Sequence, residues 1–366
     1  MTVPFFDYTH VFRRDKQRYL AEIERVCDKG AFILQEEVQR FEDDLAAFLG
    51  VRHAIGVSNA TDGLLLILLA LGLPRNAEVI VPSHTFVASA AAVHFAGLVP
   101  VLCDVGPDHM ISAPDAENRV TSKTRAIMPV HLNGRSCDMN AISTLAQQHD
   151  LEIVEDAAQA LGARCGERLA GTFGRAASFS FYPAKTLGAL GDGGAVVTDD
   201  DSLAISIREL RDHGRDPSGV VRRWGLNCRL DNVQAAILTL KLQQFGEDIS
   251  RRRAIANQYQ AGLSDLDTLT LPPGPGEDPD RFDTYQNYEV EAQDRDELKS
   301  FLARRGIGTI VQWGGSGVHQ LGALGLEAQL PTVERLMSNS LLLPMNVSLQ
   351  DYQVDLVCSA IRDFYQ

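Results

Sequence analysis

Between residues 54 and 198 the chain alternates short apolar strands with helical segments, and this alternation limits the fold most strongly. Seven runs have the length and composition of strands: 54–57, 78–81, 99–105, 126–130, 152–156, 177–182 and 194–198. Helix-length segments such as 88–95 and 139–149 separate most of them. This pattern is typical of a parallel sheet covered on both faces. We predict an α/β fold with a three-layer, mainly parallel, seven-stranded sheet.

The flanking regions predict a helical start and a second, smaller domain. Residues 15–50, 202–215 and 231–262 have helical patterns. A stretch dense in Pro and Gly follows at 271–280, and strand and helix patterns resume after it. We predict a large domain over residues 1–247 and a smaller α+β domain over residues 248–366.

Ligands of such sheets bind at the carboxyl ends of the strands. The candidate site residues are therefore those that directly follow strands, at 58–62, 83–86, 156–159 and 180–185.

The last of these segments contains Lys185. Pro183 ends the preceding strand because it has no N–H to donate. The turn after Lys185 has glycines at 188, 191, 193 and 194, which leave room for a planar ligand or another subunit. The alternative is a surface lysine before a flexible loop.

Composition excludes several classes of function. The chain has 366 residues, with 34 basic and 48 acidic side chains and a net charge of −14, which argues against a general binder of nucleic acid or membrane surfaces. Its six cysteines are scattered without zinc-site spacing, so no metal site is predicted. The start lacks the features of a signal peptide, and the longest apolar run, 64–71, is too short to cross a bilayer. We expect a soluble, cytoplasmic protein.

Several long motifs occur in an order and spacing that resemble one enzyme family. They are VSNATDGL (57–64), PSHTFVAS (82–89), PVHLNG (129–134), VEDAAQALGA (154–163), FSFYPAKTLGALGDGGAVVT (179–198), LRDHG (210–214) and NCRLDNVQAAIL (227–238). The chain resembles the DegT/DnrJ/EryC1/StrS family of sugar aminotransferases, which depend on pyridoxal 5′-phosphate (PLP). This resemblance implies the aspartate aminotransferase fold, fold type I, and a cofactor that cycles between PLP and its amine form, PMP.

The resemblance assigns roles to three polar residues. Lys185 is expected to form the Schiff base with PLP and then to move the proton. Asp156 is expected to face the pyridine nitrogen, although a helix N-cap is an alternative. Gln159 is expected to bond the phenolic oxygen of the cofactor, with a plain helix-surface glutamine as the alternative.

Other residues are expected to hold the phosphate and the ring. The cap-rich turn at Ala60 and Thr61 offers free backbone N–H groups to the phosphate. By resemblance, Ser180 adds a hydroxyl, and Asn227 reaches the phosphate from a second subunit, which implies a homodimer with shared sites. Phe86 matches the ring that stacks on the cofactor, whereas a lone Phe is more often part of a core.

The segment 311–319 departs from the family pattern and is expected to govern which sugar fits. Trp313 is a candidate wall for the sugar or a core residue of the smaller domain, and His319 matches a histidine of the family. The arginines at 222, 223 and 251–253 suit either a nucleotide diphosphate or solvated helix faces.

We predict the transfer of an amino group, most simply from L-glutamate, to a 3- or 4-keto group of a nucleotide-linked 6-deoxyhexose. The alternatives are a keto-cyclitol aminotransferase, a PLP- or PMP-dependent sugar dehydratase, and a non-enzymatic regulator on the same fold. Lys185 argues against the dehydratase, because such relatives lack a Schiff-base lysine.

Overall fold

A seven-stranded sheet forms the centre of the computed structural model, which describes residues 2–366. Its strands are β1 (His53–Val57), β2 (Glu78–Pro82), β3 (Val99–Cys103), β4 (Thr124–Ile127), β5 (Glu152–Asp156), β8 (Ala176–Ser180) and β9 (Gly194–Thr198). The order is β1-β9-β8-β5-β4-β2-β3, and only β9 runs antiparallel to its neighbours. The predicted α/β fold and all seven predicted strands are confirmed.

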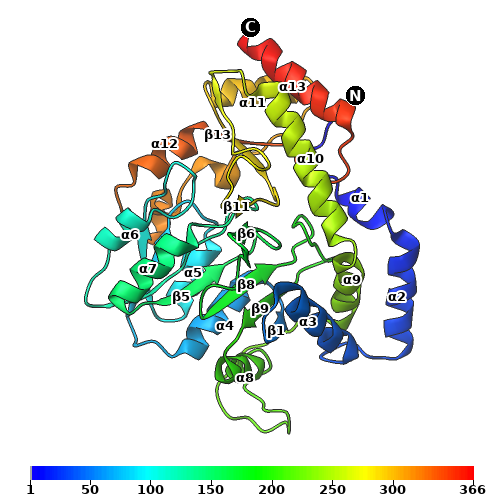
Figure 1. Ribbon diagram of the computed structural model, residues 1–366. Helices are drawn as coiled ribbons and strands as arrows, with labels where there is room; N and C mark the ends of the chain where they lie inside the picture. Colours follow the sequence, from blue (N-terminus) through cyan, green and yellow to red (C-terminus); the bar gives the residue numbers. More distant parts are fainter. Residues whose placement is uncertain (1) are drawn as a thin grey trace.

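Helices cover both faces of this sheet (Figure 1). They are α3 (Glu36–Leu49), α4 (Ala60–Leu71), α5 (Ala88–Phe95), α6 (Ala113–Asn118), α7 (Met139–His149), α8 (Asp201–Leu210) and α9 (Asn232–Leu242). The alternating side chains of β8 enter different cores. Ala176 packs with α4 and α8, whereas Phe179 packs with α3 and α9. This alternation produces the three layers.

One predicted helix ends earlier than expected, and another is divided in two. The segment predicted at 202–215 stops at Leu210, because His213 and Gly214 adopt positive φ, which a helix cannot include. The segment predicted at 231–262 is two helices, α9 and α10 (Phe245–Leu263). The break allows α9 to pack on α3 while α10 packs on α13 (Asp351–Tyr365).

The C-terminal part has its own core around a three-stranded sheet. That sheet is made of β10 (Leu269–Thr270), β12 (Tyr288–Ala292) and β13 (Ser340–Leu343), covered by α10, α11 (Arg295–Arg304) and α13. Val3 pairs with Ile307, so both chain ends lie at this side of the molecule (Figure 1). Helix α10 runs through the predicted boundary at 247/248, which stays a prediction.

The remaining elements are short or peripheral. They are α1 (Tyr8–Arg13), α2 (Lys16–Asp28), β6 (Arg164–Cys165), β7 (Arg168–Leu169), β11 (Arg281–Phe282), α12 (Pro331–Asn339) and the 3₁₀ turns Gln312–Gly315, Val318–Gln320 and Gly322–Leu324. Within residues 2–366, every helix is too short or too polar to cross a membrane. The same residues contain no group of three or more His, Cys, Asp or Glu side chains arranged to hold a metal ion.

A buried carboxylate fixes the first strand to the helices around it. Glu42 on α3 is only 2% exposed, and it accepts hydrogen bonds from the Gly56 N–H at 2.8 Å, from Arg208 at 2.6 Å and from Arg211 at 2.5 Å. Arg211 is itself buried. Removing one partner of such a pair leaves an uncompensated charge inside the protein.

We therefore expect Glu42→Leu to lower the free energy of unfolding by about 3 kcal/mol. The matched control is Glu36→Leu in the first turn of the same helix, where the side chain is 79% exposed and the expected change is within about 0.5 kcal/mol. Urea denaturation of the three proteins measures both values. Equal changes in the two variants would contradict this account of Glu42.

Candidate active site

One cavity of about 620 Å³ lies at the carboxyl edge of the central sheet. Eight of the ten residues predicted for the site line it: Ala60, Thr61, Phe86, Asp156, Gln159, Ser180, Lys185 and Trp313. Seven of them come from the ends of β5 and β8, from the start of α4 and from the loop after β2, whereas Trp313 comes from the 3₁₀ turn Gln312–Gly315. The sheet edge thus brings together residues that lie far apart in the sequence.

Lys185 lies on a closed turn after β8. Its N–H donates to the Tyr182 carbonyl at 2.8 Å. Gly188 lets the chain double back, because a Cβ there would lie 2.4 Å from the Pro183 oxygen. Burial lowers the pKa of the Lys185 amine from 10.5 to about 8, although the charge of Asp156 acts in the opposite direction. About a tenth of this amine is therefore uncharged at pH 7, whereas an amine of ordinary pKa is almost fully protonated there, and only the uncharged form is a nucleophile.

Asp156 ends β5 and is buried. Its two carboxylate oxygens accept hydrogen bonds from the Ser89 hydroxyl at 2.6 Å and from the Ala158 N–H at 3.1 Å. No helix begins after Asp156, so the structure excludes a helix N-cap. Sequence reasoning did not identify Ser89, although it lies within the PSHTFVAS motif.

The orientation of the Gln159 amide follows from its neighbour Asn133. The Asn133 N–H donates to Gln159 Oε1 at 2.9 Å, which identifies that atom as the oxygen. The amide NH₂ of Gln159 is therefore the end left for a ligand. Residues 157–163 form turns, so Gln159 is not on a helix surface. Asn133 has φ of +56° and was not predicted as a site residue.

The start of α4 forms a cradle of N–H groups. Asn59 caps the helix by accepting from the Asp62 N–H at 2.8 Å. Within the described chain, the N–H groups of Ala60 and Thr61 have no acceptor, so they are available to an anion. Gly194 permits the close approach of β9, because a Cβ there would lie 2.6 Å from the Asn59 carbonyl carbon.

Aromatic side chains form walls of the cavity. Phe86 is 56% exposed and lines the cavity, so it is not a core residue. Tyr182 also lines it; it lies in the predicted segment 180–185, but no role was assigned to it. Trp313 lines the cavity and packs edge-on against His84, with ring centroids 5.0 Å apart. Trp313 packs against the core cluster beside the central sheet and not against that of the C-terminal part, so the alternative of a core residue of the smaller domain is not supported, and its role as a wall for the sugar stays a prediction.

Two predicted residues lie outside the cavity of their own chain. The buried His319 side chain pairs through Nδ1 with the Ser83 hydroxyl at 2.7 Å, and its Nε2 lies 3.5 Å from Glu334. Asn227 is exposed and pairs with Asp212 in the segment after α8. Trp224, which lies shortly before Asn227 in the same segment, is 97% exposed.

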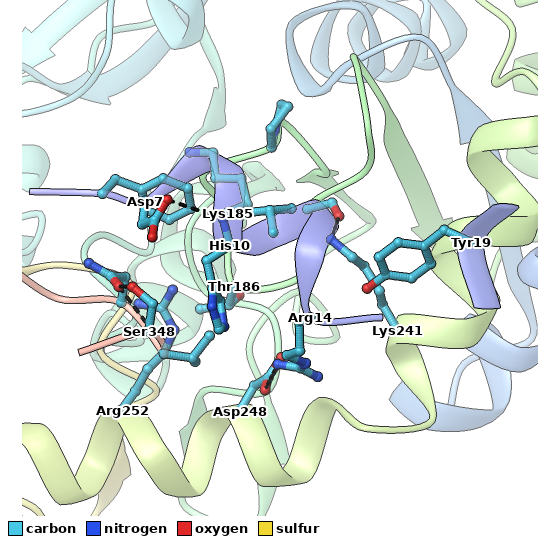
Figure 2. Close-up of a pocket in the computed structure, with 16 residues that line it drawn as sticks. Asp7, His10, Arg14, Tyr19, Lys185, Thr186, Lys241, Asp248, Arg252 and Ser348 are labelled. Atoms are coloured by element: carbon cyan, nitrogen blue, oxygen red, sulfur yellow. Dashed lines mark hydrogen bonds and ion pairs between the residues drawn. The ribbon is translucent and has the colours of Figure 1, made fainter. Parts of the chain in front are cut away.

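A second, smaller cavity of about 50 Å³ also reaches Lys185 (Figure 2). It lies under α1 and contains a second lysine, Lys241, whose pKa burial lowers to about 8. Its charges are largely compensated, since Arg14 pairs with Asp248 at 2.6 Å and Lys241 donates to the Gly188 carbonyl. The larger cavity is therefore the candidate active site.

Comparison with known proteins agrees with this geometry. Residues 13–362 match the DegT/DnrJ/EryC1/StrS aminotransferase family. A Streptomyces venezuelae relative named dTDP-3-amino-3,4,6-trideoxy-alpha-D-glucose transaminase is 40% identical over 99% of this chain and 96% of its own. The "Pleiotropic regulatory protein" of Geobacillus stearothermophilus is 37% identical over 100% of this chain and 99% of its own.

Solved structures give the same result. The crystal structure of S. venezuelae DesV in complex with a ketimine intermediate superposes with a TM-score of 0.95 at 39% identity, covering 100% of this chain and 99% of that one. A DegT DnrJ EryC1 StrS aminotransferase from Brucella abortus superposes with a TM-score of 0.92 at 34% identity, covering 99% of each chain. This chain therefore belongs to the DegT/DnrJ/EryC1/StrS aminotransferase family.

Proposed function

We propose that this protein transfers an amino group from an amino acid, most simply L-glutamate, to a 3- or 4-keto group of a nucleotide-linked 6-deoxyhexose. The observation that carries the proposal is the placement of the Lys185 amine, the Asp156 carboxylate and the free N–H groups of α4 on one cavity. The names of the relatives, which include transaminases of dTDP-linked and UDP-linked sugars, support the substrate class.

The residues of the cavity fit PLP. The cradle at Ala60 and Thr61, with the Ser180 hydroxyl, would hold the phosphate, and Phe86 would pack on the ring. Asp156 would face the pyridine nitrogen, and the Gln159 NH₂ would donate to the phenolic oxygen. When bound, the cofactor supplies an electron sink that stabilises negative charge at the carbon of the amino donor.

Each protein group then has a defined task. The Lys185 amine, when unprotonated, would take the proton from the carbon that bears the amino group of the donor and hold it for return, which its lowered pKa allows near neutral pH. The Asp156 carboxylate stays paired with the Ser89 hydroxyl, which orients it toward the cavity. Trp313 and Tyr182 flank the space left for the sugar.

The proposal includes a homodimer in which Asn227 completes the site of the partner subunit. Exposure of Asn227 and of Trp224 on one segment supports this arrangement, because both are directed away from the core of their own chain. The six free cysteines agree with a reducing, cytoplasmic location.

A second candidate is a regulatory protein on the same fold, which the name of the G. stearothermophilus relative favours. A regulator does not need a lysine of lowered pKa beside a buried carboxylate. The presence of both groups on the cavity favours the enzyme.

Attachment of the cofactor to Lys185 is directly testable. Purified protein is incubated with PLP and reduced with borohydride, and the modified peptide is identified by mass spectrometry. We expect the label on Lys185, and Lys185→Ala should keep the fold but lose both the label and the turnover. Lys241 is the internal competitor, because its pKa is also about 8, and a label there would contradict the proposal.

The pH dependence of Lys185 reports on Asp156. In cofactor-free protein, acetylation of Lys185 by acetic anhydride should be half-maximal near pH 8, because the amine reacts only when unprotonated. The Asp156 charge raises this pKa, so Asp156→Asn should move the midpoint to lower pH. Asp192→Asn, which also removes a carboxylate from the cavity wall, is the matched control and should not move it. A wild-type midpoint near 10 would refute the lowered pKa.

Shared sites predict complementation between two inactive variants. Lys185→Ala loses the amine, and Asn227→Asp places a negative charge where we expect the phosphate of the partner subunit. Subunits mixed after mild dissociation should recover about a quarter of wild-type turnover, since half of the dimers then hold one intact site. No recovery, with subunit exchange verified by native mass spectrometry, would exclude a site shared through Asn227.

A further inference from the structure

The side chain of Gln286, in the C-terminal part, forms hydrogen bonds with the residues on both sides of Lys185. The Gln286 amide donates through Nε2 to the Ala184 carbonyl at 2.9 Å and accepts through Oε1 from the Thr186 N–H at 2.7 Å. These two groups belong to the residues on either side of Lys185. The two ends of one amide therefore hold the peptide units before and after Lys185. We call this pair of hydrogen bonds the bracket.

Gln286 is itself held firmly. It is 7% exposed, and the buried Arg252 donates through Nη1 to the carbonyls of Tyr285 at 3.0 Å, Gln286 at 3.1 Å and Met345 at 3.2 Å. Figure 2 shows Arg252, Lys185 and Thr186 around the smaller cavity. Tyr285 has φ of +51°, a strained conformation that these contacts maintain.

Gly134 packs directly against the backbone that carries Gln286. Gly134 has φ of +88°, and a Cβ there would lie 2.5 Å from the backbone nitrogens of Tyr285 and Gln286. The Thr284 N–H donates to the Gly134 carbonyl at 2.8 Å. The backbone that carries Gln286 is thus pressed against the loop that contains Asn133.

Asn287, the residue after Gln286, connects the same segment to Gln159 through Asn133. Asn287 Nδ2 donates to Asn133 Oδ1 at 2.8 Å, and the Asn133 N–H in turn donates to Gln159. Two consecutive side chains therefore connect one short segment to Lys185 and to Gln159, which lie on the same cavity.

We propose that Gln286 is a positioning residue that fixes the backbone of Lys185, so that its amine enters the cavity from one direction. The inference rests on the proposed function for its catalytic consequence. The physical reason is that a lysine has four flexible side-chain torsions, so the amine is placed reproducibly only if its backbone is fixed. The glycine-rich turn that follows Lys185 provides little stiffness of its own.

The bracket can be tested without the cofactor. Gln286→Met keeps the size of the side chain and removes both hydrogen bonds. Hydrogen exchange of cofactor-free protein should show the Thr186 amide losing protection by about tenfold or more. Gln260→Met is the matched control, because Gln260 also donates to a backbone carbonyl, that of Pro272, away from Lys185. Unchanged protection at Thr186 in Gln286→Met would overturn the proposal.

The catalytic consequence needs a second measurement. With PLP bound, conversion to the amine form by saturating glutamate should slow about ten- to a hundredfold in Gln286→Met and should not slow in Gln260→Met. Equal rates in Gln286→Met and wild type would refute positioning. If wild-type protein does not attach PLP at Lys185, the proposed function fails, whereas hydrogen exchange still decides whether the bracket exists.

A pH-dependent rescue separates positioning from general destabilisation. In Gln286→Glu, a protonated carboxyl has one donor and one acceptor and can remake both bonds, whereas the ionised form cannot donate to the Ala184 carbonyl. Divided by the wild-type rate at each pH, the half-reaction rate of this variant should rise as pH falls. A pH-independent ratio would contradict the proposal, and this variant keeps the test decisive if Gln286→Met does not fold.

Discussion

The candidate site depends on placing an amine of lowered pKa and a buried carboxylate on the same cavity wall. Burial favours the neutral form of Lys185, whereas the nearby Asp156 favours its ammonium form, and burial prevails. Asp156 is buried, and the Ser89 hydroxyl and the Ala158 N–H both donate to its carboxylate, which offsets the cost of removing that group from water. Burial therefore lowers the pKa of Lys185, and local hydrogen bonds compensate the burial of Asp156.

The parallel sheet explains why these groups meet. β5 and β8 are neighbours and run in the same direction, so the residues that follow them emerge at one edge. The antiparallel β9 returns beside them, and Gly194 lets it pass against the N-terminus of α4. The fold therefore places an amine, a carboxylate and a group of free N–H donors within one cavity before any ligand binds.

The sequence predicted the parts of this arrangement that depend on local patterns. Strand spacing located all seven strands, and the residues after strands included Asp156 and Lys185. Contacts between distant segments were not predictable in this way. Nothing in the sequence pattern indicates that the Gln286 side chain bonds the backbone on both sides of Lys185, or that the Asn133 N–H donates to Gln159, because these contacts depend on how distant segments pack. The division of 231–262 into two helices has the same cause, since α9 and α10 pack on different partners.

A crystal structure of the protein grown with PLP tests the central claim most directly. We predict electron density continuous with Lys185 Nζ, with the pyridine nitrogen against the Asp156 carboxylate and the phosphate at the N–H groups of Ala60 and Thr61. Density joined to Lys241 in the smaller cavity, or a ring that faces away from Asp156, would contradict the account.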